Sequence, residues 1–118
     1  MSQVQLIRVS AAGTTRIVSF SSEHINRMDT ARQIGWQMTE LLDSESWSRT
    51  DADCVNLDFK DIHWISSAGL NQLIGINSMA RSQGIKLILL DVPEKVREIF
   101  ALTRLERMFE FGSSAVHA

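Results

Sequence analysis

Two adjacent serines, Ser66 and Ser67, are the side chains with the clearest potential for chemistry. They lie between an apolar segment typical of a strand and a run with helical spacing, and open α/β sheets place their ligand sites at such junctions. Free backbone N–H groups and the positive end of the helix dipole stabilise an anion there, including a phosphate carried on serine. The alternative for either serine is an N-cap, the usual role of serine at the start of a helix, and one serine can serve as both.

A catalytic role for these serines would need a base and an oxyanion site. His63 is the nearest base, but the sequence has no Gly-x-Ser-x-Gly elbow, and no motif places an acid that would orient the imidazole. The glycine-rich loops of nucleotide-binding proteins, G-x-x-x-x-G-K-S/T and G-x-G-x-x-G, do not occur in the sequence. We therefore expect a protein that is not an enzyme and that uses no cofactor.

Composition disfavours metal, nucleic-acid and membrane functions. His24, His63 and His117 are far apart and Cys54 is the only cysteine, so no zinc-ligand spacing occurs and no internal disulfide can form. The chain carries 12 basic and 14 acidic side chains, without the basic stripe that nucleic acid requires. No apolar run approaches the roughly 18 residues of a membrane span, and the N-terminus does not resemble a secretory signal, so we expect a cytoplasmic protein.

The length of 118 residues predicts a single domain over residues 1–118. Residues 4–9 and 14–20 favour β structure and should pair as an antiparallel hairpin around a turn at residues 11–13. Thr30, with Gln33 three residues later, matches a capping box and predicts a helix that begins there and ends near residues 43–46.

Trp36 falls on the face of this helix opposite its apolar stripe. It is either an exposed contact residue or a residue packed along a loop or a neighbouring helix.

A strand, helix, strand unit follows. Residues 54–59 alternate as in a strand, residues 67–83 keep a largely helical period with Gly84 as the stop signal, and residues 86–92 form the next strand. A right-handed crossover should make the two strands parallel. The apolar run at residues 87–90 does not alternate, which predicts a strand covered on both faces.

A third helix should begin at Pro93 and Glu94, because the missing N–H of proline costs nothing in the first helical turn. Residues 108–111 form either a last short strand or a loop packed on the core. The buried side of the third helix should comprise Val96, Ile99, Phe100 and Leu102. Together these elements predict the α/β class, with a mixed sheet of four or five strands, an N-terminal hairpin and helices packed against the sheet.

The stretch from Leu57 to Leu70, LDFKDIHWISSAGL, resembles the signature of STAS domains, the sulfate transporter and anti-sigma factor antagonist family. That signature reads strand, a few loop residues, then Asp-Ser-Ser-Gly-Leu. The likeness continues through residues 82–89 and 96–105 and extends over most of residues 4–111. The resemblance implies a STAS-like fold for the single domain.

The resemblance also implies roles for individual residues. Ser67 matches the serine that is phosphorylated in anti-sigma factor antagonists, with Ser66 as the alternative phosphoacceptor. This sequence departs from the family twice, because Ser66 stands where aspartate is usual and Ala68 where a second serine is usual. The implied partner is an anti-sigma factor and serine kinase of the histidine-kinase-like ATPase type. The residues expected to contact it are Trp64, Ser66, Ser67, Ala68, Gly69 and Asn71.

Two functions therefore remain open. The protein is either an anti-sigma factor antagonist, a transcription regulator switched by phosphorylation of Ser67, or an unswitched STAS interaction module in a signalling or lipid-transport assembly. Trp64, beside the serines, is either an interface anchor or a core tryptophan.

Overall fold

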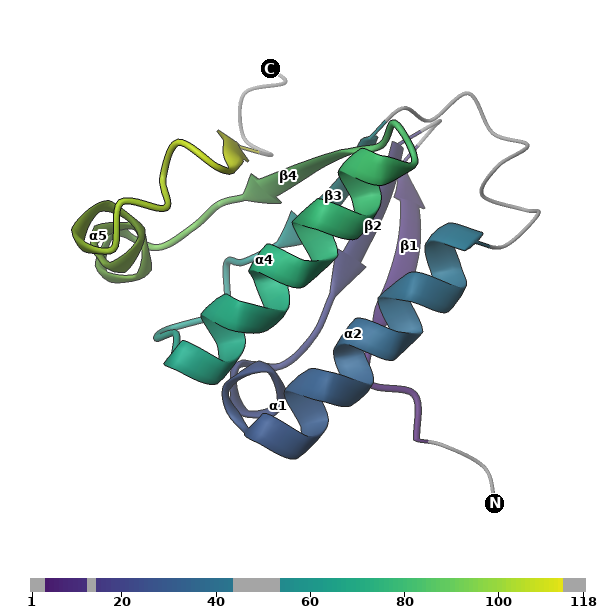
Figure 1. The fold of residues 1–118 in the computed structure, drawn as a ribbon, viewed down its shortest axis with the longest axis horizontal. Helices are drawn as coiled ribbons and strands as arrows, with labels where there is room; N and C mark the ends of the chain where they lie inside the picture. Colours follow the sequence, from purple (N-terminus) through teal and green to yellow (C-terminus); the bar gives the residue numbers. More distant parts are fainter. Residues whose placement is uncertain (1–3, 13–14, 44–53, 114–118) are drawn as a thin grey trace.

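The computed structural model describes residues 4–12, 15–43 and 54–113. They contain one mixed sheet of five strands in the order β1-β2-β3-β4-β5 (Figure 1). The first two strands pair antiparallel, and each later strand runs parallel to the one before it. The predicted parallel pairing across the strand, helix, strand unit is confirmed, as is the fold class. The strands are β1 (Arg8–Ala12), β2 (Thr15–Ser19), β3 (Cys54–Asp58), β4 (Lys86–Leu90) and β5 (Glu110–Gly112).

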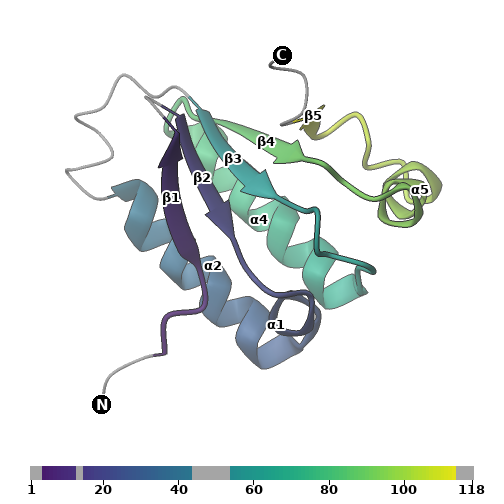
Figure 2. The ribbon, with the colours of Figure 1, turned by 180° about the vertical axis from the view of Figure 1, so that it is seen from behind.

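The two long helices lie side by side on one face of this sheet, and the view from behind shows the strands in front of them (Figure 2). A short helix precedes the first long one in the chain. A further helix, which follows β4 and precedes β5 in the chain, lies beside the sheet. The helices are α1 (Ser22–Asn26), α2 (Met28–Asp43), α4 (Ser67–Ser82) and α5 (Glu94–Leu102).

The core lies between the sheet and the two long helices. Ile34 and Met38 of α2 and Leu73 of α4 are fully buried in the same cluster as alternate residues of the strands. In β4, Leu87 and Leu89 are buried whereas Ile88 is only half-buried. The expectation that both faces of this strand are covered is therefore wrong, because the helices α2 and α4 pack on one face only.

The N-terminal hairpin is shorter than predicted. β1 begins at Arg8 because the preceding residues pair with a buried glutamine of α2 instead of a strand. The Oε1 atom of Gln37 accepts hydrogen bonds from the backbone N–H groups of Leu6 (2.8 Å) and Ile7 (3.2 Å), and Nε2 donates to the carbonyl of Val4 (2.8 Å). The expected turn at residues 11–13 is wrong at its first two positions, which belong to β1, and Gly13 lies outside the described residues.

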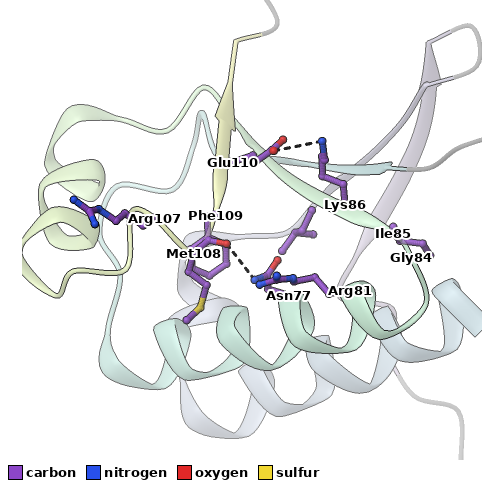
Figure 3. Close-up of a pocket in the computed structure, with 10 residues that line it drawn as sticks. Asn77, Arg81, Gly84, Ile85, Lys86, Arg107, Met108, Phe109 and Glu110 are labelled. Carbon is purple, nitrogen blue, oxygen red and sulfur yellow. Dashed lines mark hydrogen bonds and ion pairs between the residues drawn. The ribbon is translucent and has the colours of Figure 1, made fainter.

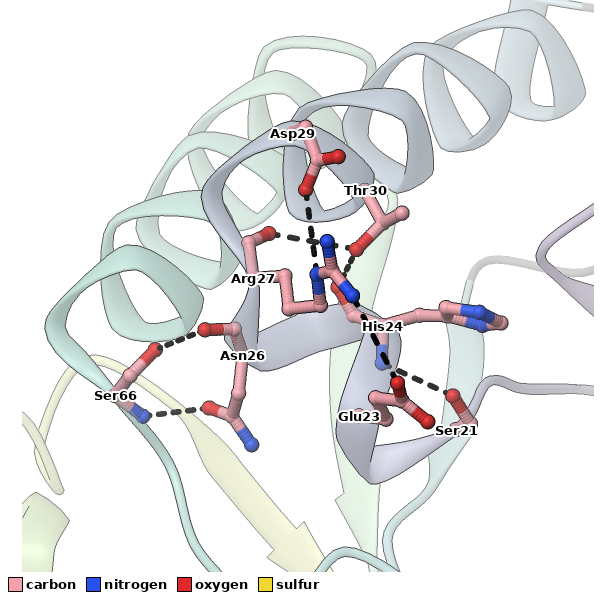
Figure 4. Close-up of polar contacts among 8 residues, drawn as sticks. All are labelled: Ser21, Glu23, His24, Asn26, Arg27, Asp29, Thr30 and Ser66. Atoms are coloured by element: carbon pink, nitrogen blue, oxygen red, sulfur yellow. Dashed lines mark hydrogen bonds and ion pairs between the residues drawn. The ribbon is translucent and has the colours of Figure 1, made fainter.

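The capping box predicted at Thr30 is wrong, because α2 begins earlier, at Met28. The Thr30 hydroxyl instead donates to the carbonyl of His24 (2.6 Å), which joins α2 to the short helix α1 (Figure 4). α1 was not predicted, although Ser21 is a regular N-cap whose hydroxyl accepts from the backbone N–H of His24 (3.0 Å). α2 ends at Asp43, as expected.

The C-terminal elements agree with the prediction except at two residues. Pro93 is the N-cap of α5 rather than its first helical residue, and Leu102 is 83% exposed. Leu105, beyond the helix, packs against the core instead, and its backbone N–H donates to the carbonyl of Phe100 (2.8 Å). Of the two alternatives for residues 108–111, the strand is confirmed from Glu110 onward as β5, whereas Met108 and Phe109 lie in the loop before it.

Candidate functional site

Ser66 is the N-cap of α4. Its backbone is extended (φ −89°, ψ 170°), and its Oγ atom accepts a hydrogen bond from the backbone N–H of Gly69 (3.1 Å). The same hydroxyl donates to the carbonyl oxygen of Asn26 (3.2 Å). The hydroxyl proton and one lone pair are thus both used inside the fold, and the N-cap alternative is confirmed for this serine.

Asn26, the last residue of α1, holds the loop that leads into α4 (Figure 4). Its Oδ1 atom accepts from the backbone N–H of Ser66 (2.6 Å), and its Nδ2 atom donates to the carbonyls of Trp64 (2.9 Å) and Ser22 (2.8 Å). The side chain is buried, with 8% of the residue exposed. Buried polar groups satisfied in this way fix the geometry of the backbone around them. Sequence reasoning missed Asn26, because it lies far from the serines in the chain.

Gly69 allows α1 to pack closely on the first turn of α4. A Cβ atom at this position would lie 2.7 Å from Cδ1 of Ile65 and 3.0 Å from the backbone oxygen of Ile25. Of the residues predicted to contact a partner, Gly69 is therefore buried beneath α1 and adds no side-chain surface.

Three of the residues predicted to contact a partner are exposed at this end of α4, and we call them the Ser67 surface: Trp64, Ser67 and Asn71. Ser67 is the first helical residue, and its hydroxyl forms no hydrogen bond with the residues that the structure describes. Trp64 is 53% exposed, so the alternative of a core tryptophan is wrong. Ile62 and Ile65 fill the core on either side of it.

The remaining predicted residues lie at the margin of this surface. Ala68 is half-buried, and His63 is exposed in the loop. The first turn of α4 contains no acidic residue, so no carboxylate of that turn competes for the positive end of the helix dipole. The arrangement can accept a hydrogen-bonding or anionic group at Ser67.

Trp36 lies apart from the Ser67 surface. It is 56% exposed on α2 and lines a shallow pocket of about 180 Å³ with Gly35 of the same helix and Met79 of α4. The ring is exposed and also lies beside a neighbouring helix, and its role as a contact residue stays a prediction.

Over residues 4–12, 15–43 and 54–113, no group of three or more His, Cys, Asp or Glu side chains could hold a metal ion. None of the described helices combines the length and apolar character needed to span a bilayer. His117 lies outside the described residues.

The protein is a small α/β domain with a mixed five-stranded sheet and two long helices on one face of it. Its candidate site lies at the N-terminus of α4, the helix that follows the parallel strand β3 and begins with Ser67. The chain belongs to the STAS domain family, whose model matches residues 3–118. No curated protein matches the chain.

Solved structures show the same fold. The Thermotoga maritima protein TM1081, in its NMR structure, has a TM-score of 0.76 at 17% identity, covering 98% of this chain and 86% of that chain. An anti-sigma-factor antagonist (STAS) domain protein from Planctomyces limnophilus has a TM-score of 0.72 at 15% identity, covering 92% and 90%. The anti-sigma factor antagonist SpoIIAA, in its unphosphorylated form, has a TM-score of 0.67 at 13% identity, covering 92% and 90%. Identities this low establish a shared fold alone.

Proposed function

We propose that this protein is a non-enzymatic cytoplasmic regulator that binds an anti-sigma factor and serine kinase of the histidine-kinase-like ATPase type. The observation that carries the proposal is that two neighbouring serines differ in their hydrogen bonding. Ser66 is engaged in the fold through Asn26 and Gly69, whereas the hydroxyl of Ser67 is exposed and has no described partner.

The partner contacts the Ser67 surface. Trp64 supplies a large exposed ring, and aromatic residues of this kind often anchor protein interfaces. Asn71 lies one helical turn after Ser67 and is also exposed, so these two side chains lie on the same face of α4. Ser66 and Ala68 line its margin.

Phosphorylation of Ser67 is the switch in this proposal. A phosphate adds about 1.5 to 2 negative charges at the N-terminus of α4, where the helix dipole and free N–H groups stabilise them. The fold should therefore tolerate the modification. A partner packed over Ser67 meets a desolvated phosphate, and a kinase with bound nucleotide adds like-charge repulsion, so the complex dissociates.

Ser66 is the less suitable phosphoacceptor. A phosphate on its Oγ atom would remove the proton donated to Asn26 and crowd the bond from Gly69. The departure from the family at Ser66 then has a structural meaning, because serine, like aspartate, is a strong N-cap.

The test is the affinity of a candidate kinase for the wild type, Ser67→Asp and Ser78→Asp, measured by titration calorimetry. Ser78 is exposed on the same helix, which makes it a matched control. We expect Ser67→Asp to weaken binding about tenfold or more and Ser78→Asp to leave it unchanged. Equal binding by all three proteins would contradict the switch and favour an unswitched STAS module in a signalling or lipid-transport assembly.

A further inference from the structure

A second polar site lies toward the opposite end of α4, in a groove of about 400 Å³ between this helix, the start of β4 and the chain that enters β5 (Figure 3). Arg81 of this groove follows Ser67 by 14 residues, which corresponds to about 21 Å along the helix. The groove is therefore independent of the Ser67 surface. We call it the β5 groove, and its polar lining comprises Asn77, Arg81, Lys86, Arg107 and Glu110.

Asn77 is the buried polar residue of the β5 groove. Only 4% of it is exposed, and its Nδ2 atom donates to the carbonyl of Met108 (3.3 Å). Its Oδ1 atom accepts no hydrogen bond from the residues that the structure describes. A buried amide oxygen without a protein partner is costly unless water or a ligand donates to it. Asn77 thus offers a ligand one acceptor and its second N–H.

The groove also carries uncompensated positive charge. Arg81 and Arg107 form no ion pair with a described residue, whereas Lys86 pairs with Glu110 (3.4 Å). Arg107 lies on one side of the chain at Met108, and Arg81 and Lys86 lie on the other (Figure 3). On the side of the groove where Asn77 lies, Arg81 is thus a cation with no described partner, which favours a ligand that carries a carboxylate.

The start of β4, at Lys86 and Leu87, borders this groove. The pairing of β4 with β5 begins at Ile88, opposite Glu110, so Lys86 and Leu87 have no β5 partner among the described residues. An unpaired strand edge offers backbone N–H and C=O groups to an incoming extended peptide. An asparagine amide likewise pairs with the N–H and C=O of a peptide unit.

We propose that the β5 groove binds a short, extended, acidic peptide segment of a partner protein. Its main chain lies along Lys86 and Leu87 and hydrogen-bonds to the amide of Asn77. One of its carboxylates pairs with Arg81. This surface adds a second attachment point to the regulator and does not depend on the state of Ser67.

The probe is a capped hexapeptide of alternating glutamate and valine, titrated into the ¹⁵N-labelled protein and followed by NMR. We expect saturable shifts of the Asn77 side-chain amide and of the backbone amides at residues 85–87 and 108–110. The same peptide with glutamine in place of glutamate should bind at least fivefold more weakly, because the ion pair is lost. Shifts confined to other residues, or equal binding of the two peptides, would overturn the proposal.

Variants sharpen the test. Arg81→Gln should weaken binding of the glutamate peptide about fivefold, whereas Arg32→Gln, an exposed arginine on α2, should not change it. Glu110→Gln should tighten binding about twofold, because it removes the one carboxylate of the groove. Ser67→Asp should have no effect. If sodium glutamate at the same carboxylate concentration produced the same shifts, the site would bind a lone anion and the peptide proposal would be wrong.

Discussion

The two ends of α4 differ in how their polar groups are satisfied. At the N-terminal end, Ser66 and Asn26 are paired with the backbone and with each other, whereas the exposed side chains of Ser67 and Asn71 have no partner among the described residues. Toward the C-terminal end, the amide oxygen of Asn77 and the guanidinium of Arg81 have no partner among the described residues. A polar group paired within the chain contributes to the fold, whereas one left unpaired at a surface is available to a partner.

Asn26→Ala should cause the largest loss of stability among the variants of these two regions. It removes the side chain that bonds to the loop at Trp64 and Ser66, and it leaves the backbone N–H of Ser66 without its partner. We expect a loss of about 2–4 kcal/mol in the free energy of unfolding, measured by urea denaturation. Asn71→Ala, at an exposed asparagine of α4, is the control and should stay within about 0.5 kcal/mol. Equal losses would show that Asn26 does not hold the site.

Substitution of two glycines of α4 by alanine should change stability in opposite directions. Gly69→Ala places a methyl group against Ile65 and the backbone of Ile25, so the free energy of unfolding should fall by about 1–3 kcal/mol. At Gly75 a Cβ atom would meet nothing within 4 Å, so Gly75→Ala should raise it by about 0.5–1 kcal/mol through helix propensity. Thermal unfolding of both variants checks this. A stable Gly69→Ala protein would contradict the close approach of α1 to α4.

Alanine substitutions of the two serines should differ in the free energy of unfolding, by less than the two glycine substitutions do. Ser66→Ala removes the N-cap and should lower the free energy of unfolding by about 1 kcal/mol. Ser67→Ala removes an exposed hydroxyl without a described partner and should change it by less than about 0.5 kcal/mol. Urea denaturation of the two variants side by side measures the difference. A larger loss for Ser67→Ala would reverse the assignment of cap and free serine.

The sequence was informative where the signals are local. The strand at Cys54, the helix led by Ser67 and the stop at Gly84 follow from short-range periodicity and turn chemistry, and Gly84 has the positive φ (73°) that such a stop requires. The contacts of Asn26 and Gln37 join segments about 30 to 40 residues apart through side chain and backbone, and they leave no local pattern.

Other predictions were wrong or left open because the sequence pattern behind them is compatible with more than one structure. Thr30 fits a capping box, but the earlier start of α2 turned its hydroxyl toward α1. The apolar run of β4 fits a strand buried on both faces, but one face is only half-covered. Trp64 was ambiguous because a loop residue beside two isoleucines can point either way, and only packing decides which residues enter the core.

The fold uses Ser66 as the N-cap of α4 and leaves the Ser67 hydroxyl without a partner among the described residues, and we propose that Ser67 is the residue that is phosphorylated. The most direct measurement is phosphosite mapping by fragmentation mass spectrometry after incubation of the wild type, Ser66→Ala and Ser67→Ala with ATP and a serine kinase of the histidine-kinase-like ATPase type. The account predicts one phosphate, on Ser67, in the wild type and in Ser66→Ala, and none in Ser67→Ala. A phosphate on Ser66 of the wild type, or one that persists in Ser67→Ala, would contradict it.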